Sequence, residues 1–177
     1  MEYKKIILKR GKEDSLKRFH PWVFSGAIDS WDDTIEEGDL VSVYSHDGKH
    51  IGNGHFQVGS ISVRILTFSN EEINESFFSE RLQAALELRK SLDLLRDDNT
   101  SFRLVHGEGD FLPGLVIDIY GNTAVVQAHS PGMHFARNLI ANALVNMPSK
   151  LVENVYYKSE TTLPSSVGFR DFLTRSI

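Results

Sequence analysis

The chain has 177 residues, 41% hydrophobic and 24% charged, a balance that is ordinary for a soluble globular protein and excludes global disorder. No apolar run approaches the roughly 20 residues that a membrane-spanning helix needs, and residues 1–16 lack the apolar stretch of a signal peptide. The absence of cysteine excludes disulfides, a thiolate nucleophile and a cysteine-rich zinc site. These features favour a cytoplasmic protein.

The net charge of −5 disfavours nucleic-acid binding on average, but the charges are unevenly distributed. Residues 1–18 carry seven bases and three acids, whereas residues 29–39 carry six acids and no base. A basic surface can therefore exist on an acidic protein, although an ordinary solvated surface explains the same pattern equally well.

The first 70 residues predict a small β domain. Residues 3–9 are rich in β-forming side chains, and residues 40–45 and 60–68 alternate with the period of a half-buried strand. The Asp47-Gly48 pair is typical of a tight hairpin, so residues 49–56 are expected to return as the partner strand. Several short strands with glycine-rich turns indicate a compact barrel or sandwich.

Residues 18–28, with the sequence R-F-H-P-W-V-F-S-G-A-I, predict one short helix inserted among these strands. Pro21 suits the first turn of a helix, where its missing N–H costs nothing, and Gly26 suits a helix end. Trp22 and Phe24 have side chains that can stack on bases, although packing in the core is the more ordinary role for Trp22. Arg10, Arg18 and Arg64 are the arginines of this domain that can meet phosphates.

From residue 74 the apolar period changes and predicts an α+β unit of antiparallel strands covered by helices. Asn74 is a good N-cap for an amphipathic helix over residues 75–96, whose apolar stripe is Phe78, Leu82, Ala85, Leu88, Leu92 and Leu95. A second helix is expected over residues 133–147, and strands over residues 102–105, 115–120, 123–129 and 152–157.

The glycine-rich segment at residues 107–114, G-E-G-D-F-L-P-G, is the most prominent motif of the second unit. A nucleotide or S-adenosylmethionine site needs such a turn between a strand and a helix, but here Pro113 interrupts the segment and a strand follows. We therefore expect a structured loop. Glu108, Asp110 and Asp118 are candidates for acid–base chemistry or metal binding, yet structural roles explain them better, and the seven histidines show no metal-ligand spacing.

Three segments together resemble a known family: R-F-H-P-W-V-F-S-G-A-I at 18–28, V-Y-S-H-D-G at 43–48, and R-L-V-H-G-E-G-D with L-P-G-L-V-I-D-I-Y-G over 103–121. They are similar to the RlmI-like class I S-adenosylmethionine-dependent methyltransferases of large-subunit (23S) rRNA. The similarity runs in order along nearly the whole chain.

The resemblance implies an N-terminal PUA domain for RNA at residues 1–70, a central α+β domain at 74–160, and residues 161–177 as a linker toward a Rossmann-like catalytic domain that this sequence lacks. That domain would hold S-adenosylmethionine and the cysteine that attacks cytosine before methyl transfer to C5. No catalytic, cofactor-binding or metal-binding residue is therefore expected within the chain. The expected RNA-contacting residues are Arg10, Arg18, His20, Trp22, Ser25, Gly26 and Arg64.

The leading hypothesis is an RNA-binding portion of an rRNA methyltransferase, with rRNA as partner and no membrane association. The alternative is a non-catalytic scaffold, or a module that forms a homodimer and does not contact RNA. Salt-dependent RNA binding and the oligomeric state in solution discriminate between the two.

Overall fold

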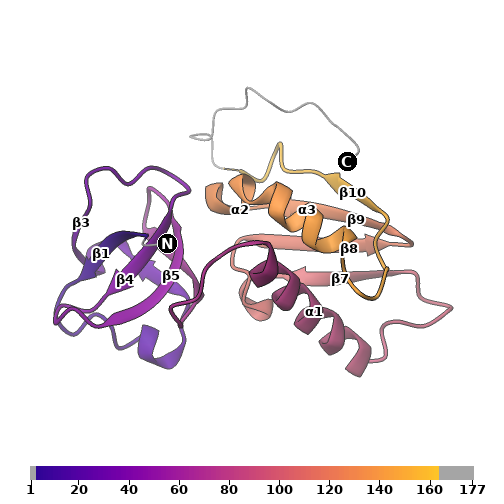
Figure 1. The fold of residues 1–177 in the computed structure, drawn as a ribbon, viewed down its shortest axis with the longest axis horizontal. Helices are drawn as coiled ribbons and strands as arrows, with labels where there is room; N and C mark the ends of the chain where they lie inside the picture. Colours follow the sequence, from indigo (N-terminus) through magenta and orange to yellow (C-terminus); the bar gives the residue numbers. More distant parts are fainter. Residues whose placement is uncertain (1–2, 164–177) are drawn as a thin grey trace. The chain divides into compact units, whose positions relative to one another are not determined.

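The computed structural model describes residues 3–163, which fold as two compact units that divide between Ile73 and Asn74 (Figure 1). The predicted linker at 161–177 falls almost wholly outside the described residues.

The first unit is built on one six-stranded sheet with the strand order β2-β6-β5-β4-β1-β3. The predicted hairpin of β4 and β5 is confirmed: the strands pair antiparallel, and Gly48 takes a positive φ of 81° in the turn between them. The two edge strands, β2 and β3, are consecutive in the chain and joined by the three-residue turn η2, so the sheet curls enough to bring the end of β2 near the start of β3. The strands are β1 (Lys4–Leu8), β2 (Trp22–Phe24), β3 (Ile28–Trp31), β4 (Leu40–Tyr44), β5 (His50–Phe56) and β6 (Ile61–Thr67).

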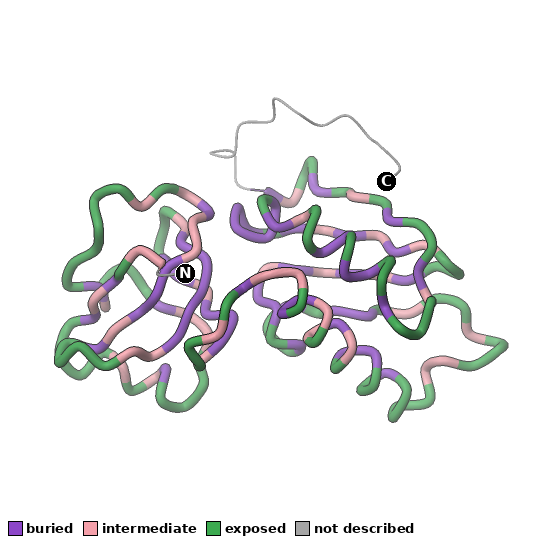
Figure 2. The backbone as a smooth tube through the Cα atoms, in the orientation of Figure 1, coloured by how far each residue is buried: buried purple, intermediate pink, exposed green. Residues whose placement is uncertain are grey.

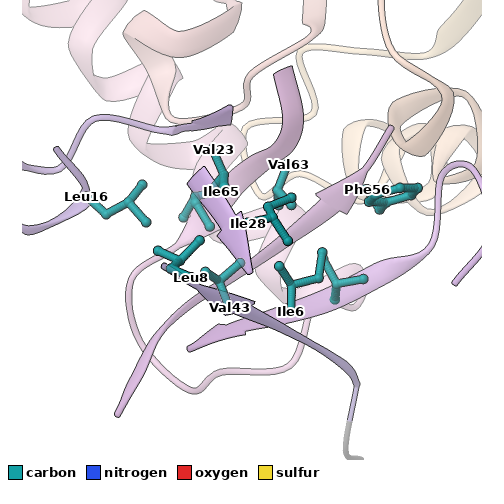
Figure 3. Close-up of a cluster of buried hydrophobic side chains, with 10 residues drawn as sticks. Ile6, Leu8, Leu16, Val23, Ile28, Val43, Phe56, Val63 and Ile65 are labelled. Carbon is teal, nitrogen blue, oxygen red and sulfur yellow. The ribbon is translucent and has the colours of Figure 1, made fainter. Parts of the chain in front are cut away.

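Every strand of the first unit contributes at least one apolar side chain to a single core, which Figure 3 shows in close-up. Val63 and Ile65 of β6 point into it while Arg64 between them does not, as the period of a strand requires. Leu16 reaches the same core from outside the sheet. The members are Ile6, Leu8, Leu16, Val23, Ile28, Val41, Val43, Phe56, Val63 and Ile65.

The helix predicted over residues 18–28 is wrong. Two single 3₁₀ turns, η1 (Leu16–Arg18) and η2 (Ser25–Ala27), stand on either side of β2. Val23 is buried in the core and pairs with Val63, so the segment gains more as an edge strand than as a helix. Pro21 is compatible with this arrangement because proline is tolerated at the start of an edge strand.

The second unit contains a four-stranded sheet with the order β10-β9-β8-β7. The pairs β7–β8 and β8–β9 are antiparallel, as predicted, whereas β10 lies parallel to β9. Helices α1 and α3 pack against each other over one face of this sheet, and burial alternates along β8 and β9 accordingly (Figures 1 and 2). The elements are α1 (Glu75–Ser91), β7 (Ser101–His106), η3 (Gly107–Asp110), β8 (Leu115–Tyr120), β9 (Thr123–Ala128), α2 (Pro131–Phe135), α3 (Arg137–Val145) and β10 (Asn154–Tyr157).

Helix α1 begins as predicted and ends earlier than predicted. The Asn74 side chain accepts a hydrogen bond of 3.1 Å from the Phe77 N–H, which confirms it as the N-cap. The helix stops at Ser91 instead of residue 96, and Leu88 and Leu92 of the predicted apolar stripe are exposed.

Arg89 occupies the buried stripe of α1 and fixes the glycine-rich segment that follows β7. Its guanidinium forms a two-pronged pair with Asp110, through Nη1–Oδ1 and a 2.8 Å bond from Nη2 to Oδ2, and its Nε donates to the Arg103 carbonyl at 3.0 Å. Asp110 also accepts the His106 N–H at 2.6 Å. The segment is the structured loop expected, and Asp110 serves the fold of the second unit.

The helix predicted over residues 133–147 is two helices, because the chain turns at Ala136 between α2 and α3. Asp118 is paired with Arg103 across β7 and β8 at 2.8 and 3.0 Å, the structural role favoured for it. Among residues 3–163 no group of three metal-ligating side chains occurs, and no helix there is long and apolar enough to cross a membrane.

Candidate nucleic-acid interface

A row of aromatic rings follows strand β2 on the outside of the first unit. Trp22 and Phe24 lie on the side of the strand opposite to Val23, which points into the core. The rings of His20 and Trp22 are 5.5 Å apart and those of Trp22 and Phe24 6.3 Å apart, each pair close to perpendicular. Trp22 is therefore not the core residue expected, and Phe24 is 48% exposed.

Arg64 extends this row onto the neighbouring strand. It lies directly opposite Trp22 in the antiparallel pairing of β2 with β6 and is half-buried. Its Nη1 donates to Gln57 Oε1, which holds the guanidinium on the outer surface. His55 of β5 is the next residue in register, and its burial together with the Arg64 charge lowers the pKa of the His55 ring to about 4. His55 is therefore neutral at physiological pH, and Arg64 supplies a permanent positive charge opposite Trp22.

The basic segment at residues 9–18 is attached at both ends of β2. The Lys9 N–H donates to the Ala27 carbonyl at 2.9 Å, and Lys9 Nζ donates to the Gly26 carbonyl at 3.1 Å. At the other end the His20 N–H donates to the Ser15 carbonyl at 3.1 Å, and Leu16 is buried in the core. The positive charges of this segment are thus kept close to the aromatic row.

Most charges of this segment are available to a ligand. Lys17 is paired with Glu13 and Asp14, each at 3.2 Å. By contrast Arg10, Lys12 and Arg18 are exposed and make no ion pair within the part of the chain that the structure describes. The acidic stretch at 29–39 is partly neutralised elsewhere, because Lys4 pairs with Asp39 at 2.7 Å, an arrangement that raises the pKa of Lys4.

The structure brings His20, Trp22 and Arg64 into one row and leaves Ser25 and Gly26 exposed in η2 at its end. Arg10 and Arg18 lie in the attached basic segment and not in the row itself. The expected RNA contacts did not include Phe24, which continues the row, or Lys9, whose Nζ donates to the Gly26 carbonyl; Phe19, also not included, directly precedes His20 in the chain. The R-F-H-P-W-V-F run places His20, Trp22 and Phe24 at every second position, so a strand assignment would have put Phe24, already a candidate for stacking on bases, on the same side as Trp22.

Comparison with known protein families identifies the domain type of the first unit. A family profile described as a PUA-like domain matches residues 6–68, nearly the whole of the first unit. The first unit is therefore a PUA-like domain, joined to an α+β unit, as predicted.

The chain as a whole is similar to proteins named Ribosomal RNA large subunit methyltransferase I, which confirms the resemblance found in the sequence. It is 38% identical over 167 residues to the protein from Vibrio parahaemolyticus, covering 94% of this chain and 41% of the relative. It is 39% identical over 147 residues to the protein from Klebsiella pneumoniae, covering 82% of this chain and 36% of the relative. The chain thus spans about two fifths of the length of these curated relatives.

The fold is also found in a solved structure from Streptococcus mutans, described as a candidate SAM-dependent methyltransferase. The TM-score is 0.73 at 20% sequence identity, over 90% of this chain and 41% of that one. At this identity the likeness shows that the two chains share a fold.

Proposed function

We propose that this chain is the RNA-binding portion of an S-adenosylmethionine-dependent rRNA methyltransferase, and that its PUA-like unit holds the RNA. The observation that carries the proposal is the outer surface of that unit. There the row of His20, Trp22, Phe24 and Arg64 adjoins exposed cations that have no ion pair among residues 3–163. Aromatic rings stack on bases and cations meet phosphates, so this combination suits single-stranded or looped RNA.

The composition of the chain supports a separation between RNA binding, by these residues, and methyl transfer, by residues outside them. Methylation of cytosine C5 in the manner of the similar family needs a thiolate, and these 177 residues contain no cysteine. In this proposal the methyl donor and the nucleophile are held outside residues 1–177, and residues 1–70 raise the local concentration of rRNA at that catalytic site. Residues 74–160 form the central domain between the two. The similarity to rRNA methyltransferases favours a cytoplasmic location.

The proposed contacts are Arg10, Arg18, His20, Trp22, Ser25, Gly26 and Arg64. Ser25 and Gly26 lie in an exposed turn, where the Ser25 hydroxyl can meet a phosphate; the Ser25 N–H already donates to the Ser60 carbonyl at 2.9 Å. Gly26 has nothing within 4 Å of the position that a Cβ would occupy, so the turn is open on that side.

The test is equilibrium binding of a structured rRNA fragment by the chain across a salt series. Affinity is expected to fall steeply as salt rises, because phosphate contacts release counterions. In the Arg10→Gln/Arg18→Gln variant, the slope of log affinity against log salt should become shallower by about two, one for each phosphate that is no longer neutralised. The matched control is Lys150→Gln/Lys158→Gln, which removes the same charge from exposed positions of the second unit.

Equal slopes in the two double variants would contradict this placement of the RNA. No detectable binding at low salt would refute the proposal itself. Light scattering that then showed a stable homodimer would favour the alternative role as a dimerisation module.

A further inference from the structure

Phe19 has a backbone conformation that its side chain does not favour. It follows η1 with φ 62° and ψ 24°, in the left-handed region that glycine adopts without cost. The other positive-φ positions among residues 3–73 are all glycines: Gly11, Gly38, Gly48 and Gly59. Phe19 is thus the one positive-φ position of residues 3–73 that is not a glycine, and backbone strain of this kind is concentrated at functional sites.

Burial does not explain the phenylalanine. Phe19 is 67% exposed, the largest exposed fraction among the phenylalanine, tyrosine and tryptophan residues within 3–163. One side of the ring meets Phe68, with the centroids 5.2 Å apart and the planes at 87°. Phe68 is half-buried and packs against the core of the first unit. The pair fixes the orientation of the Phe19 ring and leaves most of its surface to solvent.

The backbone around Phe19 is also fixed. Its N–H donates to the Leu16 carbonyl at 2.8 Å, and the next residue, His20, donates to the Ser15 carbonyl at 3.1 Å. Leu16 is buried, so the turn is anchored to the core. A fixed, exposed ring loses little conformational freedom when a flat ligand binds to it.

The charges around Phe19 favour a nucleotide over a purely apolar ligand. Arg18 precedes it, exposed and without an ion pair among the described residues, and His20 follows it as the first ring of the aromatic row. Phe111 of the second unit provides a contrast. It has a similar φ of 57° and is 58% exposed, but it follows the acidic Glu108 and Asp110.

We propose that Phe19 is a stacking platform for one unpaired RNA base, with Arg18 placed to meet the adjoining phosphate. The inference rests on the proposed RNA binding and makes it more specific: the first unit holds a looped or single-stranded segment, because a base inside a duplex cannot offer its face to a protein ring.

The experiment compares two RNAs, a hairpin with 2-aminopurine in its unpaired loop and a fully paired duplex of equal length. Phe19→Leu removes the aromatic face but keeps an apolar side chain. It should weaken hairpin binding about 5- to 150-fold, the range for loss of one stacked base, and leave duplex binding unchanged. The salt slope should stay the same, since every cation that meets a phosphate is retained. Binding to the wild-type chain should quench 2-aminopurine fluorescence, and binding to the variant should not.

Two further variants control the result. Phe19→Gly suits the left-handed turn, so the tryptophan-monitored unfolding midpoint should not fall as RNA affinity falls. Phe111→Leu should leave RNA affinity unchanged. Hairpin binding by Phe19→Leu at wild-type strength, with the Arg10/Arg18 variant still weakened, would overturn this inference and leave the proposed function standing. Failure of the wild-type chain to bind either RNA would instead overturn the proposed function.

Discussion

Breaking the ion pair between Arg89 and Asp110 should selectively destabilise the second unit. The side chain of Asp110 is 3% exposed and that of Arg89 10%, so removal of either partner leaves the other charge with little water to solvate it. Loss of one member of such a buried pair typically costs about 3–5 kcal/mol. Arg89→Met removes the guanidinium and its bond to the Arg103 carbonyl, so we expect its cost to lie within this range.

The chain carries spectroscopic reporters that separate the two units. Both tryptophans, Trp22 and Trp31, lie in the first unit, whereas the α-helices of the described residues all lie in the second. In urea titrations of Arg89→Met, the midpoint of the circular dichroism signal at 222 nm should therefore fall while the tryptophan fluorescence midpoint stays in place.

A double substitution tests whether the cost comes from the unpaired charge. In Arg89→Met/Asp110→Leu neither charge of the pair remains, and replacement of a buried pair by apolar side chains is often close to neutral. The double variant should thus be more stable than Arg89→Met alone. A loss below about 1 kcal/mol in Arg89→Met, or a double variant less stable than the single one, would refute this account of the pair.

Three further changes have expected outcomes. The pKa of His55 is lowered to about 4 from its ordinary 6.5, so the unfolded chain binds a proton before the folded one does. Stability of the first unit should therefore fall by up to about 3 kcal/mol as pH drops from 6.5 to 4, and His55→Gln should remove this part of the acid sensitivity in fluorescence-monitored unfolding. Asn74→Ala should cost about 1 kcal/mol in the helical signal through loss of the N-cap. Gly114→Ala should cost about 1–3 kcal/mol, because φ is 83° and the new Cβ would lie 2.6 Å from Ser130 Oγ; Ser130→Gly should recover only the part due to that contact.

Most strands of both units were predictable from segments that are rich in β-forming residues or alternate in polarity, whereas β3 (Ile28–Trp31) was not predicted and β2 was expected to be helical. In residues 40–45 and 60–68 the alternating valines and isoleucines identify the core side, but Ser42 and Ser62, expected on the opposite side, are buried as well. The segment at 18–28 was mispredicted because Pro21 suits a helix start as well as an edge strand. Whether this segment forms a strand or a helix depends on the pairing of Val23 with Val63, which lies forty residues away in the sequence. The local sequence alone does not indicate that pairing.

The end of α1 shows the same limit. Leu88 and Leu92 continue the apolar spacing, but the buried position is taken by Arg89 because Asp110 is there to pair with it. A charged residue in a buried stripe is explained only by its tertiary partner.

For the candidate interface, the residue types of the aromatic and basic segment were identifiable from the sequence, and their proposed role in RNA binding rests partly on the similarity to rRNA methyltransferases. The left-handed turn at Phe19 was not, since nothing in the local sequence requires a positive φ there. The pairing of Trp22 with Arg64 depends on strand register, which is likewise a tertiary property.

The proposed placement of RNA on the first unit is tested most directly by amide chemical-shift mapping of the ¹⁵N-labelled chain during titration with the looped RNA. We predict that the shifts concentrate at residues 9–26 and around Arg64, and that the sheet of the second unit, residues 101–157, is largely unaffected. Shifts confined to the second unit, or none at a saturating RNA concentration, would contradict the account.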